Sequence, residues 1–343
     1  MTSEESVERY HRQVLLPVIG EAGQQRLHRG RVCVLGVGAL GTHVAMLLAR
    51  AGVGFLRLVD RDVLEWTNLQ RQVLYEEADV ESALPKAVAA ARALERVNRD
   101  VSIEPVVIDV DATSIVPLIA DVDVVVDGSD NFELRYLLND AALELNKPWI
   151  YGGAIGTLGT TFTVIPGETA CLRCLFPEPP PAGSVPTCDT AGVLGPAAAL
   201  VGAMQASEAI KLLVGAWSAC NRTLMTVDLW TLEIARITAR RLPDCPACAL
   251  GERRFLYERA PSRTVALCGR DAVQVVVHPH AAIDLARLAQ QLKPLGEVHY
   301  NPYLIRFRVD GYELTVFSDG RAIVRGTTDP AVARALYARY IGM

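Results

Sequence analysis

The sequence predicts a doubly wound α/β domain, whose mainly parallel sheet has an antiparallel extension, followed by a small C-terminal α+β domain. Three observations support this fold class. Apolar runs alternate with helical segments over residues 31–150, as parallel strands and crossover helices do. An antiparallel pattern begins after residue 156, and the pattern resets again near Ser262. We therefore place one domain at residues 1–255 and a second at 262–343.

The elements of the first domain follow from these patterns. Residues 7–30 predict an opening helix, and the apolar runs 31–36 and 55–60 flank a second helix, as buried parallel strands do. The predicted order continues with a helix at 85–98, strands at 101–109 and 121–127, a helix at 133–146 and a strand at 148–156.

After residue 156 the alternation of strands and helices gives way to a different pattern of predicted elements. Residues 158–168 predict an antiparallel strand, and the segment 176–192 is a loop rich in proline and glycine. The apolar segment 191–215 contains Pro196, Gln205, Glu208 and Lys211, so we expect a buried helix there and not a membrane span. Further expected elements are strands in 222–241 and 263–279, a helix at 281–292, a β region at 297–326 with turns at "VDGY" and "SDGR", and a helix at 329–341.

Composition argues against some classes of function. The 343 residues are 50% hydrophobic, which allows a large core, and the net charge is −5 without a run of like charges. Nucleic acid and membrane surfaces require basic patches, so this balance argues against both. The polar N-terminus shows no signal peptide, and eight cysteines without an export signal indicate a reducing compartment. We expect a cytoplasmic protein.

A glycine turn marks a nucleotide site. Gly36, Gly38 and Gly41 fit the Rossmann-like pattern G-x-G-x-x-G, and Asp60 follows the last glycine by nineteen residues, where a ribose-binding acid is expected. NAD, FAD and ATP all suit such a turn, because it needs only a close backbone approach and a helix N-terminus. An NAD-dependent oxidoreductase is therefore one hypothesis.

Charged and polar residues beyond Asp60 favour a triphosphate. Asn68 and Arg71 are three residues apart, on one helical turn, and Lys86 follows Pro85 at a helix start. Such donors stabilise the negative charge that grows on a leaving pyrophosphate. Asp127 and Asp130 end a buried strand, where a carboxylate suits Mg²⁺. The alternative is that these residues are solvated, with Asn68 a helix cap.

Six cysteines carry hypotheses of their own. Cys171, Cys174, Cys245 and Cys248 form two C-x₂-C pairs, the ligand pattern of a tetrahedral zinc site, although a redox pair or free thiols stay open. Cys188 lies at the end of the proline-rich loop just before the apolar helix. A helix N-terminus would lower its pKa and Asp189 would raise it, so a covalent and a packing role both remain. Cys268 is expected to be a core residue.

The motifs together resemble the ThiF/MoeB family, the bacterial relatives of ubiquitin-activating enzymes. They are "RYHRQ" at 9–13, "GVGALG" at 36–41, "LVDRDVLEWTNLQRQ" at 58–72, "PK" at 85–86, "DGSDN" at 127–131, "CLRC" at 171–174, "TCDTAGVLGP" at 187–196 and "CPAC" at 245–248. The resemblance implies ATP-dependent adenylation of the C-terminal Gly-Gly carboxylate of a ubiquitin-like sulfur carrier, which a sulfur donor then attacks. A decayed, non-catalytic carrier-binding module would lack motif residues, and none is missing.

The resemblance also implies roles for single residues. Asp60 would hold the ribose, and the phosphate ligands would be Asn68, Arg71 and Lys86. Asp130, beside Asn131, would bind Mg²⁺. Arg12 would reach the nucleotide of a second subunit, which implies a homodimer, and Cys188 would take the activated carrier as a thioester or acyl-disulfide. Adenylation of a tRNA base or a peptide carboxylate remains an alternative. The domain from 262 has no expected role beyond docking of the carrier or a partner.

Overall fold

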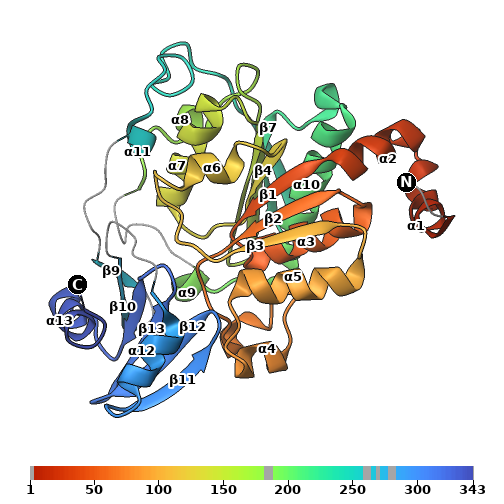
Figure 1. Ribbon diagram of the computed structural model, residues 1–343. Helices are drawn as coiled ribbons and strands as arrows, with labels where there is room; N and C mark the ends of the chain where they lie inside the picture. The colour runs from red at the N-terminus through yellow and green to blue at the C-terminus, as the bar shows by residue number, and fades with distance from the viewer. Residues whose placement is uncertain (1–3, 181–187, 258–263, 268–270, 277–282, 343) are drawn as a thin grey trace. The chain divides into compact units, whose positions relative to one another are not determined.

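The computed structural model describes residues 4–180, 188–257, 264–267, 271–276 and 283–342, with the backbone alone described at 4–7, 188–189 and 264–267. The chain divides into two compact units, Met1–Glu258 and Arg259–Met343 (Figure 1). Each unit has its own sheet and its own hydrophobic core.

An eight-stranded sheet in the order β3-β2-β1-β4-β5-β6-β7-β8 forms the first unit. The first five strands in this order are parallel and the last three add an antiparallel extension, which confirms the predicted fold class. Because the chain winds outward in both directions from β1 and β4, their carboxyl ends flank the crevice where open α/β sheets bind ligands. The strands are β1 (Arg31–Leu35), β2 (Phe55–Val59), β3 (Ser102–Val106), β4 (Val124–Asp127), β5 (Trp149–Ile155), β6 (Leu158–Val164), β7 (Thr223–Asp228) and β8 (Glu233–Thr238).

Helices cover both faces of this sheet, with α3, α5 and α10 on one face and α6 and α7 on the other (Figure 1). The helices of the unit are α1 (Glu4–Val14), α2 (Gly20–Arg29), α3 (Ala39–Ala51), α4 (Glu77–Glu81), α5 (Lys86–Val97), α6 (Ile115–Ile119), α7 (Phe132–Glu144), α8 (Leu172–Leu175), α9 (Cys188–Ala191), α10 (Gly195–Val214) and α11 (Arg254–Tyr257), with 3₁₀ turns η1 (Trp66–Asn68) and η2 (Trp217–Ala219).

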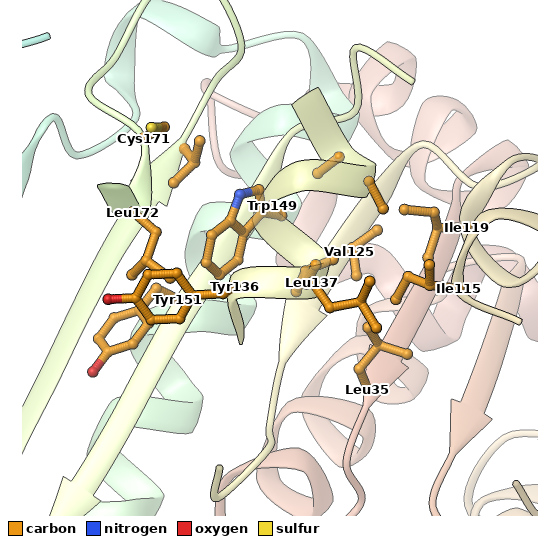
Figure 2. Close-up of a cluster of buried hydrophobic side chains, with 14 of the residues drawn as sticks. Leu35, Ile115, Ile119, Val125, Tyr136, Leu137, Trp149, Tyr151, Cys171 and Leu172 are labelled. Carbon is orange, nitrogen blue, oxygen red and sulfur yellow. The ribbon is translucent and has the colours of Figure 1, made fainter. Parts of the chain in front are cut away.

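The core beneath α6 and α7 reaches the first cysteine pair. Figure 2 shows Trp149, which is fully buried, in one cluster with Tyr136 and Leu137 of α7. Cys171 and Leu172 belong to the same cluster. The loop that carries the first cysteine pair is therefore anchored in the main core.

Two predictions about helices have different outcomes. The single opening helix was wrong, because the segment forms α1 and α2 with a break between them. The break contains Pro17, which has no N–H to donate, and α2 begins at Gly20, whose φ is +58°. The buried helix was correct. Among the described residues α10 alone is long and apolar enough to cross a membrane, yet it packs on α3 and on β4–β6.

The second unit is a six-stranded antiparallel sheet in the order β11-β12-β13-β14-β10-β9, packed with α12 and α13. Asp310 and Gly311 both have positive φ, as a two-residue hairpin turn requires. A hairpin before it was not predicted, and there the Asn301 side chain accepts from the Tyr303 and Leu304 amides. Cys268 lies outside the described residues. The elements are β9 (Thr264–Leu267), β10 (Ala272–Val275), α12 (Leu285–Leu292), β11 (Glu297–Asn301), β12 (Leu304–Val309), β13 (Tyr312–Phe317), β14 (Ala322–Arg325) and α13 (Pro330–Tyr340).

Candidate active site

The glycine turn joins β1 to α3 and packs against the loop after β4. A Cβ on Gly41 would lie 1.9 Å from the Gly36 carbonyl oxygen, and a Cβ on Gly128 would lie 2.3 Å from the same atom. Gly36 has a φ of +88°. A Cβ on Gly38, the residue before α3, would meet nothing closer than the Gln72 amide nitrogen at 3.9 Å. The other glycines allow the strand ends to pack, whereas Gly38 leaves space in front of the helix N-terminus.

Two side chains fix Val37, the residue within this turn. Asp60 Oδ2 accepts a hydrogen bond from the Val37 amide at 2.8 Å, and the Tyr75 hydroxyl donates to the Val37 carbonyl at 2.6 Å. The other Asp60 oxygen accepts from the Asp62 amide at 2.8 Å. Burial raises the pKa of Asp60, although Lys86 and these amide bonds oppose the rise. Each carboxylate oxygen retains a second lone pair for a ligand.

Lys86 is the first residue of α5 and is only 5% exposed. Its ammonium lies 2.8 Å from Asp62 Oδ2. Burial alone would lower the pKa of Lys86, but the charges of Asp62, Asp60 and Asp130 outweigh it and raise the pKa. Asp62 was not among the site residues predicted from the sequence. Its position two residues after Asp60, the expected ribose ligand, could have indicated it.

The polar segment after β2 turns back at η1. Asn68 is buried, and its Oδ1 accepts from the Glu65 amide at 3.0 Å, so the helix-cap alternative correctly describes its oxygen. Its amide nitrogen is the atom left to meet a ligand. The Arg71 guanidinium donates to the Thr67 carbonyl at 2.7 Å. Gln72, also missed, is buried beside Gly38, and its Oε1 has no hydrogen-bond partner among the described residues.

The two aspartates after β4 have different environments. Asp127 is fully buried, with one oxygen on Arg135 Nε at 3.0 Å and the other on the Ser129 amide and hydroxyl. It is committed to holding the loop. Asp130 is exposed, and its charge acts on Lys86 and Arg135. Asn131 caps α7 by accepting from the Leu134 amide.

The structure does not bring Arg12 to this site within one chain. Helix α1 packs at the carboxyl end of α3, where Tyr10 lies against Gly52 and Gln13 donates to the Ala51 carbonyl. The glycine turn lies at the amino end of the same 13-residue helix, about 20 Å away. The Cys188 side chain lies outside the described residues, although the backbone of its helix, α9, contacts β5.

The four cysteines of the two C-x₂-C pairs come together at a separate place. Their sulfurs all lie within 4.8 Å of one another, and neighbouring pairs are 3.4–3.9 Å apart. Four thiolates around one zinc ion would be about 3.8 Å apart, whereas a disulfide would need about 2.0 Å. The cluster is therefore compatible with zinc, and none of these cysteines forms a disulfide in the described structure.

Fold and site together define a nucleotide-binding α/β domain with a four-cysteine cluster. The family model described as the ThiF family matches residues 10–247, and the chain belongs to this family. It is 44% identical to the sulfur carrier protein ThiS adenylyltransferase of Bacillus subtilis, over 97% of this chain and 99% of that protein. It is 41% identical to the sulfur carrier protein adenylyltransferase of Thermus thermophilus, over 72% of this chain and 92% of that protein.

A solved structure is similar as well. The crystal structure of E. coli MccB with ATP has a TM-score of 0.61 and 26% identity, and the match covers 70% of this chain and 74% of that one. The predicted family is confirmed, and the chain is an adenylyltransferase. The hypothesis of an NAD-dependent oxidoreductase is set aside.

The glycine geometry predicts different effects for two substitutions in one motif. Gly41→Ala forces a methyl group into the Gly36 carbonyl and should destabilise the first unit by about 1–3 kcal/mol or more. Gly38→Ala meets open space and should change its stability by less than about 1 kcal/mol. Thermal unfolding followed by circular dichroism would check this, and equal losses for the two variants would contradict it.

Proposed function

We propose that this enzyme uses ATP to adenylate the C-terminal Gly-Gly carboxylate of a ubiquitin-like sulfur-carrier protein, with pyrophosphate as the other product. The observation that carries the proposal is the glycine turn, which is open at Gly38 and holds Asp60 on the Val37 amide. The Tyr75 hydroxyl lies 2.6 Å from the Val37 carbonyl and 3.2 Å from the Lys86 carbonyl, so the buried lysine begins its helix beside this turn. The relative named for ThiS, 44% identical over nearly the whole of both chains, supports the substrate class.

The described residues fit ATP. Phosphate can approach the α3 N-terminus because nothing fills the space before Gly38. The Gln72 amide nitrogen faces this space, and its oxygen, unpartnered in the described part of the chain, would accept from a donor that arrives with the nucleotide. Asp60 would hold the ribose, and Asn68, Arg71 and Lys86 would donate to the phosphates.

The chemistry needs positioning and charge more than proton transfer. A carboxylate oxygen of the carrier attacks the α-phosphorus, and the bond to the pyrophosphate oxygen breaks. The attacking group is already ionised, so no general base is required. Asp130, the exposed acid of its loop, would hold Mg²⁺, which neutralises phosphate charge when bound.

Further parts of the proposal concern partners and the later transfer. Arg12, remote from the turn of its own chain, would complete the site of a second subunit in a homodimer. Cys188 would receive the activated carrier before a sulfur donor protein acts, or pack at its helix. The four clustered cysteines would hold a structural zinc, and a reducing compartment such as the cytoplasm would preserve their thiolates.

The adenylation step is tested by ATP–pyrophosphate exchange. Exchange should require a carrier that ends in Gly-Gly and should stop when the terminal glycine is removed. Arg71→Ala should reduce the rate about 10²–10³-fold, because one fixed donor to a developing negative charge is lost. Exchange with an unrelated peptide or with tRNA, and none with any carrier, would contradict the substrate class.

The zinc site has a simple chemical test. Elemental analysis of protein purified without chelators should find one zinc per chain, and Cys245→Ser should lose the metal and unfold at a lower temperature. Cys220→Ser is the matched control, because Cys220 is buried outside the cluster. Zinc-free wild-type protein, or equal zinc in both variants, would refute the site.

The proposed role of Arg12 predicts complementation between two impaired chains. The Arg12→Ala and Arg71→Ala homodimers should each have a strongly reduced rate. Their heterodimer has one intact site and should recover about half of the wild-type rate. No recovery in a purified, verified heterodimer would show that Arg12 does not act across the interface.

A further inference from the structure

Lys86 lies close to Asp62 because the segments 62–64 and 84–86 run side by side. The Lys86 amide donates to the Asp62 carbonyl at 2.9 Å, and the Leu64 amide donates to the Leu84 carbonyl at 3.1 Å. Val63 and Pro85 form an antiparallel bridge between them. This pairing brings the Lys86 ammonium to 2.8 Å from Asp62 Oδ2.

The Lys86 ammonium has lost most of its hydration, since the side chain is only 7% exposed. An ammonium removed from water needs opposite charge nearby. Three acids face it, Asp60 and Asp62 beyond β2 and Asp130 beyond β4, and Asp62 alone makes a hydrogen bond to it. An ammonium has three N–H donors, so one bond to Asp62 leaves two for a phosphate. The buried Tyr75 hydroxyl, 3.2 Å from the Lys86 carbonyl, is the other titratable group at this helix start.

Asp62 is itself held from the other side. Arg61 lies with Nε 3.9 Å from Asp62 Oδ1, and its NH1 is 2.9 Å from Asp109 Oδ1 beyond β3. Charges therefore alternate from Asp109 through Arg61 and Asp62 to Lys86. An alternating series fixes Asp62 without a net excess of negative charge, so the carboxylate is a stable support for the lysine.

We propose that Asp62 is a positioning residue for adenylation, which keeps the Lys86 ammonium charged and directed at the triphosphate. This inference rests on the proposed function. The inference requires an anion, Asp62, to promote the binding of a second anion, ATP, at a neighbouring position. If Asp62 did nothing through Lys86, its neutralisation would strengthen ATP binding by removing repulsion.

The test measures kcat/KM for ATP against pH in pyrophosphate exchange with a Gly-Gly carrier. Asp62→Asn should lower kcat/KM at neutral pH about 10-fold or more, since the ammonium loses its anchor. Because Lys86 acts while protonated and Asp62 raises its pKa, the variant should lose activity at a lower pH. The alkaline limb should shift down by about 1 pH unit or more.

A second substitution separates positioning from general damage. Arginine stays protonated over the whole range, so Lys86→Arg in the Asp62→Asn background should abolish the shifted alkaline limb. Asp121→Asn is the matched control. It also breaks a two-arginine ion-pair network, with Arg31 and Arg57, but lies apart from the described site and should leave the pH profile in place.

The outcomes are distinct. An Asp62→Asn enzyme with a wild-type pH profile, or with improved kcat/KM, overturns the inference. If that variant does not fold, Asp62→Glu takes its place, with reduced kcat/KM and an unmoved alkaline limb expected because the charge remains but the ammonium is displaced. A fully active Asp62→Glu enzyme also overturns it. Absence of exchange in the wild type with every carrier would instead refute the proposed function.

Discussion

The close backbone contact between the ends of β1 and β4 is the constraint on which the rest of the site depends. Gly36, Gly41 and Gly128 meet there without room for a Cβ on any of them. Their approach places the first turn of α3 directly beside the loop that follows β4. Larger residues would separate the strand ends, and Asp60, Lys86 and Asp130 would no longer be held at fixed positions relative to one another. The positions of the site residues thus depend on this backbone packing.

Beside this contact, two buried cations are each paired with an acid. Asp127 holds Arg135, whose guanidinium also donates to the Ser129 and Gly152 carbonyls, and Asp62 holds Lys86. A lone buried charge would destabilise the fold by several kcal/mol, roughly 3–5 when a partner is removed. The pairs therefore fix cationic groups in place before substrate binds. Such preorganisation suits phosphoryl chemistry, in which little besides charge and alignment is required.

The unit is secured at a second point, where residues distant in sequence converge. Cys171 and Cys245 are 74 residues apart, and their sulfurs lie 3.6 Å from each other. Cys171 also belongs to the core around Trp149 (Figure 2), so the cluster extends that core and does not stand apart from it. A structural metal there would restrict a long loop-containing segment, and the benefit would be stability and not chemistry.

Local patterns in the sequence determined much of this protein. Each of these patterns lies within a few residues of sequence. The apolar runs predicted the sheet, the glycine spacing predicted the turn, and the two C-x₂-C pairs predicted the cysteine cluster. Tertiary structure decided which side chains are buried and which residues from separate elements form pairs. It separated buried Asp127 from exposed Asp130, paired Asp62 with Lys86, placed Gln72 beside Gly38, and left Arg12 at the far end of α3. A one-dimensional pattern cannot state which side chains from separate elements meet, because that is set by how strands and helices pack.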